Sequence, residues 1–454
     1  MRIQTAAYVP VAPIGAHQLL VFLLQLGSLL LLAFLLGRLA MRFGMPAVAG
    51  ELCAGVLAGP SLLAHVAPSA YNWLLPRDSS QYHMLDAVGE VGLVLLVAIT
   101  GIHMDLGLVR KRGAAAARIG IAGLAIPLGI GIGTGLLIPG SLIPGSAHRD
   151  TFALFLGVAM GVSALPVIAR ILLDLRMLHR DMGQLILCAV TVADTIGWVL
   201  LSIVSAMTTT GARGGDIGLS FGYLAIVIIV AIAGRPFVRA GLRAAAKSPQ
   251  GGSTIALVVI LALLGAAATQ AMNLEAAFGA FVIGIVINSC GTLDAARLAP
   301  LRATVLTILA PIFFAIAGLR MNLTALGQPV VLLTGLIVLC LAIAGKFAGA
   351  YIGARLGKLG HWEGVAVGAG LNARGVIEVI IAIVGLQLGV LTSGMYTIIV
   401  LVAVATSVMA PPLLRFAMTR VEHTAEEQLR ESVYDSVYGV DQVRAGNSAA
   451  RART

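Results

Sequence analysis

Asp194 is the residue of this sequence with the clearest capacity for chemistry. It stands alone in a long apolar run, residues 185–203, whose length and composition predict a membrane-spanning helix. A carboxylate at the centre of such a helix costs about 2.5–3.5 kcal/mol by insertion scales, and acids at this depth usually serve function. In a membrane, the ligands that suit one isolated carboxylate are a proton or a small cation.

Thr191 precedes Asp194 by three residues, so its hydroxyl shares the same helix face and could add a second oxygen. Carboxylate, hydroxyl and exposed carbonyl oxygens make a hard metal site suited to Na⁺, K⁺ or Li⁺, with Asp194 as the charged ligand. The same carboxylate can hold a proton instead, because desolvation disfavours its charged form. One site that accepts either ligand meets the requirement for exchange. The alternative is a structural Asp194 that only bonds a neighbouring helix.

The predicted span at 151–173 is interrupted near its middle. Pro166 removes one backbone hydrogen bond and clashes with the turn before it. Gly161 and Ser163 lie beside it and favour an unwound stretch, in which Ser163 could join the ion-binding group.

A second interruption falls in the span at 361–387, where Asn372, Arg374 and Gly375 stand at a similar depth. Interrupted spans at corresponding positions of two halves indicate the ion site of a secondary transporter. Each broken span is the middle member of a triplet, and the triplets are seven spans apart. An odd offset predicts an inverted repeat. The alternative is that Pro166 and Gly375 only kink their helices.

Three further charged residues lie inside predicted spans. Lys346 is deep in the run 330–357 with no acid near it in sequence, which favours a buried role over snorkelling to the interface. Arg374 and Glu378 are four residues apart and can pair along one helix face. Such a pair would serve structure or transport equally well.

Five other ionisable residues lie near predicted span ends. Glu51, Asp105 and Glu275 are expected to be interfacial or structural. His103 and His361 could tune a response to pH.

Composition sets the class. Of 454 residues, 59% are hydrophobic and 11% are charged, against roughly 45–50% and about 25% in soluble domains. The net charge of +10 does not indicate a nucleic-acid partner, because the basic residues sit in short clusters between apolar runs. The cysteines are read as small packing residues without disulfides: Cys53, Cys188, Cys290 and Cys340.

The sequence therefore predicts an all-α polytopic membrane protein of about thirteen spans. Their approximate limits are 17–41, 46–65, 86–106, 115–139, 151–173, 182–210, 216–235, 252–271, 273–290, 302–320, 330–357, 361–387 and 391–418. Basic clusters follow every odd-numbered span, which places the N-terminus outside the cell membrane and the C-terminus in the cytoplasm. Residues 1–16 form an extracytoplasmic segment without the features of a signal peptide. Residues 419–454 form a polar cytoplasmic tail, too short for a regulatory nucleotide-binding domain.

Eight motifs in order carry a resemblance to the monovalent cation:proton antiporter-2 family. They read PAVAGELCAGVLAGPSLL, GLVLLVAITGIHMDL, GVSALPVIARILLDLRML, AVTVADTIGWVLL, EAAFGAFVIGIVI, LAPIFFAIAGLRMNL, AGKFAGAYIGARLG and LNARGVIEVIIA, and the resemblance covers 17–418. It implies a dimerisation domain, a mobile core that moves like an elevator, and a homodimer in lipid. It also implies that two unwound helices, at Ser163–Pro166 and Asn372–Gly375, cross beside Asp194, with Lys346 at the family's lysine position. The substrates would be Na⁺ or K⁺ and H⁺, with no cofactor and no enzymatic reaction.

One position departs from that family. Before the aspartate its members commonly carry Asp, Asn or Gln, and here stands Ala193, so the usual partner of Lys346 is missing. With one carboxylate available, we expect electroneutral exchange of one cation for one proton. The alternatives are a ligand-gated potassium efflux pathway and a non-transporting sensor of the same fold.

Overall fold

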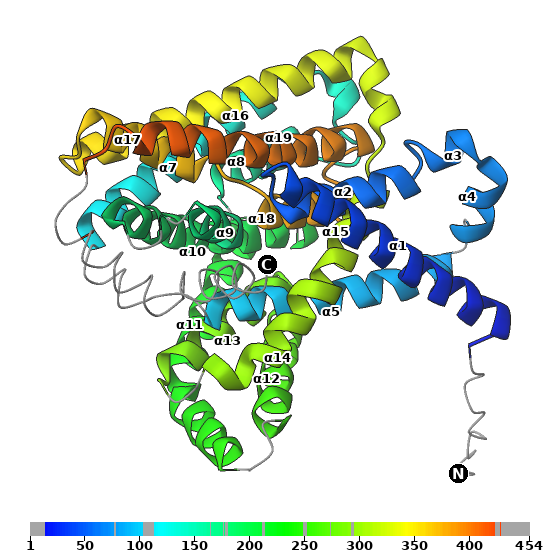
Figure 1. Ribbon diagram of the computed structural model, residues 1–454, viewed down its shortest axis with the longest axis horizontal. Coiled ribbons are helices and arrows are strands. Elements are labelled where there is room, and N and C mark those ends of the chain that lie inside the picture. The colour runs from blue at the N-terminus through cyan, green and yellow to red at the C-terminus, as the bar shows by residue number, and fades with distance from the viewer. Residues whose placement is uncertain are drawn as a thin grey trace, which may run out of the picture.

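The computed structural model is helical throughout its described part and contains no strand there (Figure 1). The described residues are 14–76, 79–102, 113–163, 165–175, 177, 180–210, 214–247, 252–272, 274–291, 295–422 and 427. Among them, ten segments are long and apolar enough to cross a membrane. This confirms the predicted class of polytopic helical membrane protein.

All thirteen predicted ranges overlap helices. The unbroken helices are α1 (Ala16–Arg42), α5 (Ser79–Ile102), α7 (Gly113–Leu137), α10 (Asp181–Thr210), α11 (Gly214–Ala246), α12 (Gly252–Ala271), α13 (Ala276–Ser289), α16 (Pro329–Leu356) and α19 (Ser393–Met418). Three further ranges hold α2 (Ala47–Ala58) with α3 (Leu63–Val66), α8 (Arg149–Gly161) with α9 (Leu165–Asp174), and α17 (His361–Leu371) with α18 (Val376–Gln387). In the last range, α14 (Ala295–Thr304) continues into α15 (Ala310–Leu319) through the π-helical turn Val305–Leu309 without a gap. Because α13 and the halves of the broken spans are short, the number thirteen stays a prediction.

Several helices are longer than the apolar segments from which they were predicted. Helix α11 continues to Ala246 although the apolar run predicted an end at 235, and α5 begins at Ser79 instead of 86. Hydropathy marks the part of a helix that lies in lipid, whereas the backbone hydrogen bonds continue into the interface. The predicted loop after α3 contains one more short helix, α4 (Pro68–Leu74), which begins with proline at a position where its missing N–H is not needed.

The two triplets with a broken middle member form one bundle. Helices α7 and α16 pack along each other and join the triplet α7–α10 to the triplet α16–α19. In Figure 1 this bundle occupies the upper half, and α1 with α2 lies to its right. Helices α11 to α14 project below.

Close helix packing depends on glycine at some crossings. Between α2 and α15, a Cβ added at Gly55 would lie 1.8 Å from the carbonyl oxygen of Ala315, and one at Gly318 would lie 2.1 Å from that of Leu52. The backbones therefore touch directly, as small residues allow in membrane bundles.

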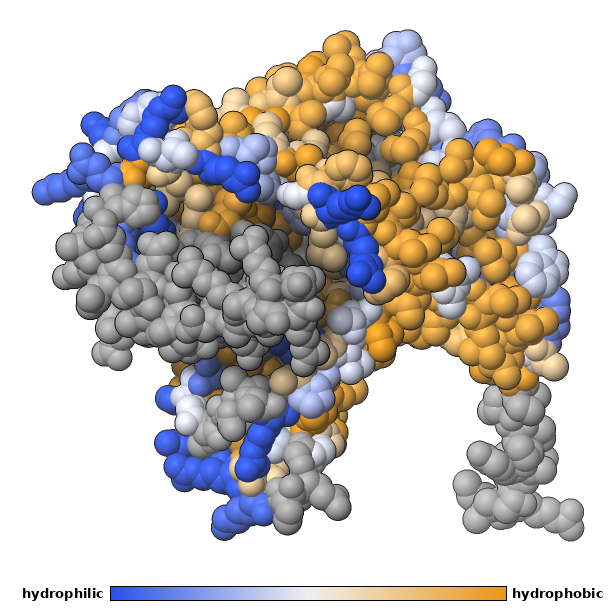
Figure 2. All heavy atoms as spheres, viewed as in Figure 1, coloured by the Kyte–Doolittle hydropathy of each residue, from blue (hydrophilic) through white to orange (hydrophobic). Residues whose placement is uncertain are grey.

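Large apolar side chains cover much of the outer surface (Figure 2). On α1 and α11 they include Leu23, Leu31, Phe34, Leu35, Ile229, Val230, Ile232 and Phe237. An exposed apolar surface of this extent fits contact with lipid. All four cysteines are free, as predicted; Cys188 and Cys290 are buried, whereas Cys53 and Cys340 are exposed on this outer surface.

Most residues of the two predicted terminal segments lie outside the described part of the chain, as do Asp105 and His103. Glu51 is buried within α2 against Gly37 of α1, which agrees with the structural one of its two expected roles. Helix α2 runs on past this residue, which brings Glu51 inside the α1–α2 contact. Glu275 precedes the first residue of α13. His361 is exposed, and its Nδ1 lies 3.0 Å from the hydroxyl oxygen of Tyr351.

Candidate functional site

The first break separates α8 from α9. Helix α8 ends at Gly161, Val162 and Ser163 are not helical, and α9 begins at Leu165. Pro166 is the second residue of α9. The break lies before the proline, because a proline ring clashes with a helical turn that precedes it. In the first turn of a helix the missing N–H of proline costs nothing, since that N–H would have no helical partner.

The second break separates α17 from α18 and contains Asn372–Gly375, as predicted. Gly375 adopts φ +156° and ψ −101°, a backbone conformation that residues with side chains rarely adopt. A Cβ at this position would also lie 2.7 Å from Cγ2 of Val167 in α9. Glycine is therefore required twice at Gly375, for the conformation and for the close approach of the other break.

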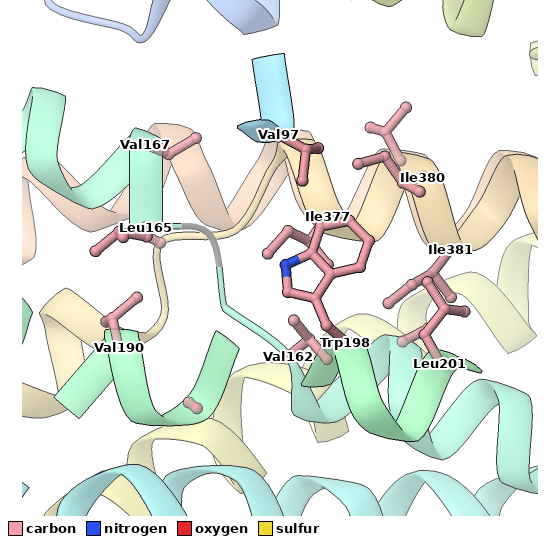
Figure 3. Packing of buried hydrophobic residues seen from close by; sticks show 14 of the residues in the cluster. Val97, Val162, Leu165, Val167, Val190, Trp198, Leu201, Ile377, Ile380 and Ile381 are labelled. Atoms are coloured by element: carbon pink, nitrogen blue, oxygen red, sulfur yellow. The ribbon is translucent and has the colours of Figure 1, made fainter. Parts of the chain in front are cut away.

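The two unwound segments meet each other. The hydroxyl of Ser163 donates a hydrogen bond to the carbonyl oxygen of Leu371, 3.2 Å away. Figure 3 shows the segments passing one another, with Trp198 of α10 between Val162 and Ile377. Trp198 is buried and stands one helical turn after Asp194 on α10, and its ring packs at this crossing. Its spacing of four residues from Asp194 is a signal that our sequence reasoning missed.

Asp194 reaches this crossing from α10. Its side chain is 1% exposed, and Oδ2 accepts a hydrogen bond of 3.0 Å from the backbone N–H of Leu165, the first residue of α9. The N-terminus of a helix carries partial positive charge and suits an anion. Oδ1 is buried and has no hydrogen-bond partner among the described residues. One oxygen thus anchors the side chain, and the other is available to a ligand.

The two predicted hydroxyl ligands have different surroundings. Thr191 is buried on α10, and its carbonyl oxygen accepts a hydrogen bond from the hydroxyl of Thr195. The contacts described for Thr191 include none between its own hydroxyl and Asp194. The Ser163 hydroxyl donates its hydrogen bond to the carbonyl oxygen of Leu371, so the lone pairs of the hydroxyl oxygen remain available to a ligand.

Lys346 and Arg374 both bind the C-terminal end of α8. The Lys346 ammonium, which is fully buried, donates to the carbonyl oxygen of Gly161. The guanidinium of Arg374 donates to the carbonyl oxygens of Ala159 at 3.2 Å and Met160 at 2.7 Å. These are carbonyls that a helix end leaves unpaired, and cations are favoured there. Lys346 is thus buried, as its depth in the span predicted.

Arg374 and Glu378 do not form the helical pair that their spacing predicted. Arg374 lies in the break, and its third bond goes to the carbonyl oxygen of Ala342 at 3.2 Å. Glu378 folds back so that Oε2 accepts the N–H of Gly375 at 2.8 Å, which caps α18. The i, i+4 rule assumes an unbroken helix, and the break at Gly375 removes that condition.

The break at Arg374 has one more support that our sequence reasoning did not find. The hydroxyl of Ser407 in α19 donates to the carbonyl oxygen of Arg374. No sequence signal marked this serine, because a polar residue in an apolar span gives no indication of the carbonyl that it faces.

The site is balanced in charge. Asp194 and Glu378 are the two buried acids, Lys346 and Arg374 the two buried bases, and Lys346 lies close enough to both acids to interact with them electrostatically. When all four are ionised, their formal charges cancel. No group of three or more histidine, cysteine or acidic residues in the described part of the chain could hold a resident metal ion.

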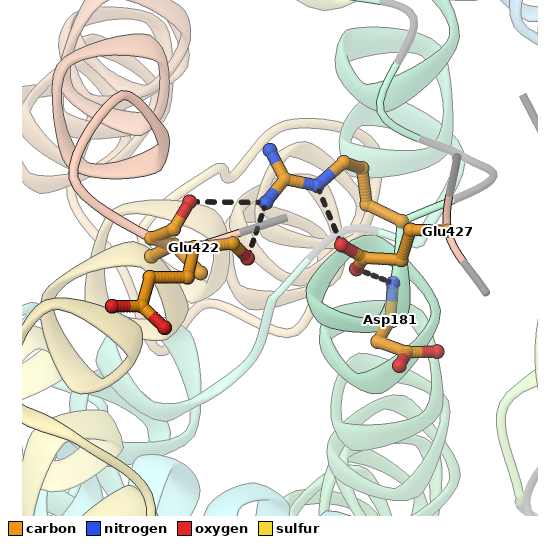
Figure 4. Close-up of polar contacts among 5 residues, drawn as sticks. Asp181, Glu422 and Glu427 are labelled. Carbon is orange, nitrogen blue, oxygen red and sulfur yellow. Dashed lines mark hydrogen bonds and ion pairs between the residues drawn. The ribbon is translucent and has the colours of Figure 1, made fainter. Parts of the chain in front are cut away.

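A second buried polar cluster joins the C-terminal segment to the loop before α10 (Figure 4). Arg180, 4% exposed, donates to the carbonyl oxygens of Val421 and Glu422, each at 3.2 Å. Its Nε lies 3.4 Å from Oε2 of Glu427, which is 2% exposed. The other oxygen of Glu427 accepts the N–H of Asp181 at 2.6 Å, at the N-terminus of α10.

Removing the charge of Glu427 is expected to release the tail. Glu427→Gln keeps an acceptor for the Asp181 N–H but leaves buried Arg180 without its carboxylate, a loss that costs about 3–5 kcal/mol in buried pairs. Limited proteolysis should then cleave after Met418 sooner than in the wild type, and a double-mutant cycle with Arg180→Gln should show coupling of about 0.5–3 kcal/mol. Glu422→Gln is the matched control, since Glu422 bonds Arg180 through its backbone. Equal cleavage of all three proteins would contradict this account.

Comparison with known proteins covers most of the chain. The family model described as "Sodium/hydrogen exchanger, transmembrane" matches residues 29–420. The Na(+)/H(+) antiporter NhaS4 of Synechocystis is 31% identical over 400 residues, which cover 88% of this chain and 97% of that protein. Cation/H(+) antiporter 15 of Arabidopsis thaliana is 31% identical over 86% of this chain, and K(+)/H(+) antiporter 1 of Saccharomyces cerevisiae is 25% identical over 88%.

The chain spans about half the length of the plant and yeast relatives, 47% and 46% of them. Among solved structures, the sodium proton antiporter MjNhaP1 from Methanocaldococcus jannaschii superposes with a TM-score of 0.65 at 14% identity. The match covers 88% of this chain and 99% of that one, and it shows a shared fold. With its motifs in order, two broken spans and a family match over most of its length, the chain belongs to the sodium/hydrogen exchanger family of membrane transporters.

Proposed function

We propose that this protein is a secondary active antiporter that exchanges a monovalent cation, Na⁺ or K⁺, for H⁺ at Asp194. The observation that carries the proposal is one buried carboxylate with an unpaired oxygen, held against the start of α9 where the two breaks meet. The relatives support it, since they are named Na(+)/H(+), K(+)/H(+) and cation/H(+) antiporters.

Charge balance supports a stoichiometry of one cation for one proton. Lys346 and Arg374 already offset Asp194 and Glu378. A proton on Asp194 therefore leaves the site at a formal charge of +1, and a monovalent cation on ionised Asp194 leaves it at the same value. The site then carries the same charge in both loaded states, so a complete cycle moves no net charge.

Alternating access by an elevator-like movement would follow from the division of the fold. The bundle of the two triplets forms the moving core, and the remaining helices form a dimerisation part that holds two copies in the plasma membrane. The N-terminus lies outside and the C-terminus in the cytoplasm. The basic clusters after the odd-numbered spans support this orientation.

Exchange in proteoliposomes is expected to ignore membrane voltage. Vesicles carrying a pH gradient are given Na⁺, K⁺ or Li⁺ in turn, and an internal dye reports the proton movement. A potential of 100 mV, set with an ion that the protein does not carry, should leave the rate unchanged, because each net charge moved would add about 2.3 kcal/mol per 100 mV. Empty liposomes give the background.

A clear dependence on voltage would overturn the one-for-one stoichiometry. It would indicate that a second group, with Lys346 as the first candidate, also releases its proton during the cycle. Absence of exchange with all three cations would overturn the antiport proposal itself.

A further inference from the structure

Asn372 is a polar side chain whose position the fold does not explain. It is fully buried at the end of α17, and neither its Oδ1 nor its Nδ2 has a hydrogen-bond partner among the described residues. Buried amides almost always form hydrogen bonds, because a buried donor or acceptor without a partner has lost its bonds to water and gained none in exchange. An apolar residue of similar size would fill this position better, if packing were the purpose.

The place of Asn372 in the fold points to an ion. The preceding carbonyl, that of Leu371, meets Ser163 of the other break, and Leu165 beyond Ser163 holds Asp194. Asn372 therefore lies in the unwound segment that crosses the break between α8 and α9, and the residue after that break, Leu165, bonds Asp194.

The C-terminal ends of α8 and α17, the helices that precede the two breaks, differ in the cationic side chains that bind them. The C-terminus of α8 is bound by Lys346 and Arg374. The last turn of α17 contains no basic residue of its own. A helix C-terminus carries partial negative charge that favours a cation, and here the fold supplies an amide oxygen in place of a charged side chain.

We propose that Asn372 is a ligand of the transported cation, which its Oδ1 binds together with Oδ1 of Asp194. This rests on the proposed antiport and deepens it, because it names a residue that serves the cation and not the proton. A neutral oxygen beside one carboxylate fits a monovalent ion, whereas a proton needs only Asp194. Substitution of Asn372 should therefore change the cation dependence of exchange and leave proton binding at Asp194 in place.

Asn372→Leu tests the proposal. Leucine has nearly the same shape and removes both unpaired polar atoms, so a purely structural site would become equally or more stable. We expect an unchanged or higher Tm without cation, together with an apparent KM for Na⁺ and K⁺ raised at least about tenfold. The rise in Tm that saturating cation gives the detergent-solubilised wild type should shrink in the same variant, because a ligand stabilises only the state that binds it.

Two further variants keep the result clear. Thr254→Val is the matched control, since Thr254 on α12 is also fully buried and its hydroxyl has no hydrogen-bond partner in the described part of the chain. Thr254 lies outside the two triplets, so the KM of this variant should equal that of the wild type. Asn372→Asp restores an oxygen ligand, and at alkaline pH it should bring KM back toward or below the wild-type value. If Asn372→Leu does not fold, the Asp variant decides: a carboxylate at this position should lower KM at alkaline pH, and a KM equal to that of the wild type would overturn the proposal.

The outcomes separate this proposal from the antiport. A wild-type KM and a wild-type cation-induced rise in Tm in Asn372→Leu would overturn the role of Asn372 while wild-type exchange continues. A wild type that shows neither exchange nor a cation-induced rise in Tm would overturn the antiport, and with it this proposal.

Discussion

Asp194→Asn is expected to abolish exchange and leave the fold intact. The amide oxygen can accept the N–H of Leu165 as Oδ2 does, so the anchor of the side chain survives. The amide cannot take up a proton or offer a negative charge to a cation. Losing one member of a buried charge pair costs about 2–5 kcal/mol, hence at least about 30-fold in cation affinity, and without a titrating group no proton is exchanged.

The measurement is proton movement in proteoliposomes, with a thermal unfolding curve for each protein. Asp150→Asn is the control, because Asp150 is an exposed acid in the first turn of α8 and loses only about 0.3–1 kcal/mol of interaction with the helix dipole. Asp194→Asn should reach the rate of empty liposomes while Asp150→Asn retains the wild-type rate. Continued exchange by Asp194→Asn would remove this carboxylate from the mechanism.

Local sequence signals predicted the elements of the site because each depends on chemistry within one span. Hydropathy gives the spans, proline and glycine give the breaks, and a lone acid in an apolar run identifies Asp194. Each of these properties depends on the residue type at one position and its neighbours along the chain. They therefore remain visible without knowledge of any neighbouring helix.

Partners across the bundle could not be predicted in the same way. The spacing of Arg374 and Glu378 indicated a pair, but the break turns the guanidinium toward α8 and α16, and Glu378 caps its own helix. Which carbonyls a buried cation binds depends on which helix ends lie nearby, and that is a property of the assembled bundle. The contact of Ser407 with the carbonyl oxygen of Arg374 could not be predicted for the same reason.

Arg374 carries the second large prediction, which concerns stability. Its guanidinium bonds the carbonyl oxygens of Ala159, Met160 and Ala342, and its side chain is fully buried. Arg374→Met keeps most of the volume but leaves these carbonyls without their donor, and Glu378 loses one of its two nearby positive charges, since Lys346 remains. Removing one member of a buried charged network costs about 3–5 kcal/mol. The Tm in detergent should fall accordingly, and exchange should be lost with it.

A lysine at this position should recover only part of the stability, because a single ammonium cannot span three carbonyls as the planar guanidinium does. Arg355→Met is the matched control, since Arg355 is exposed and bonds only the carbonyl oxygen of Leu359 among its described contacts; its effect should stay within about 0.5 kcal/mol. The order of Tm is then wild type and Arg355→Met, next Arg374→Lys, and last Arg374→Met. If Arg374→Met instead melts with the wild type but transports nothing, the guanidinium acts in ion movement and not in holding the end of α8. The buried charges would then divide differently, with Arg374 beside Asp194 in transport and Lys346 alone in support of the break.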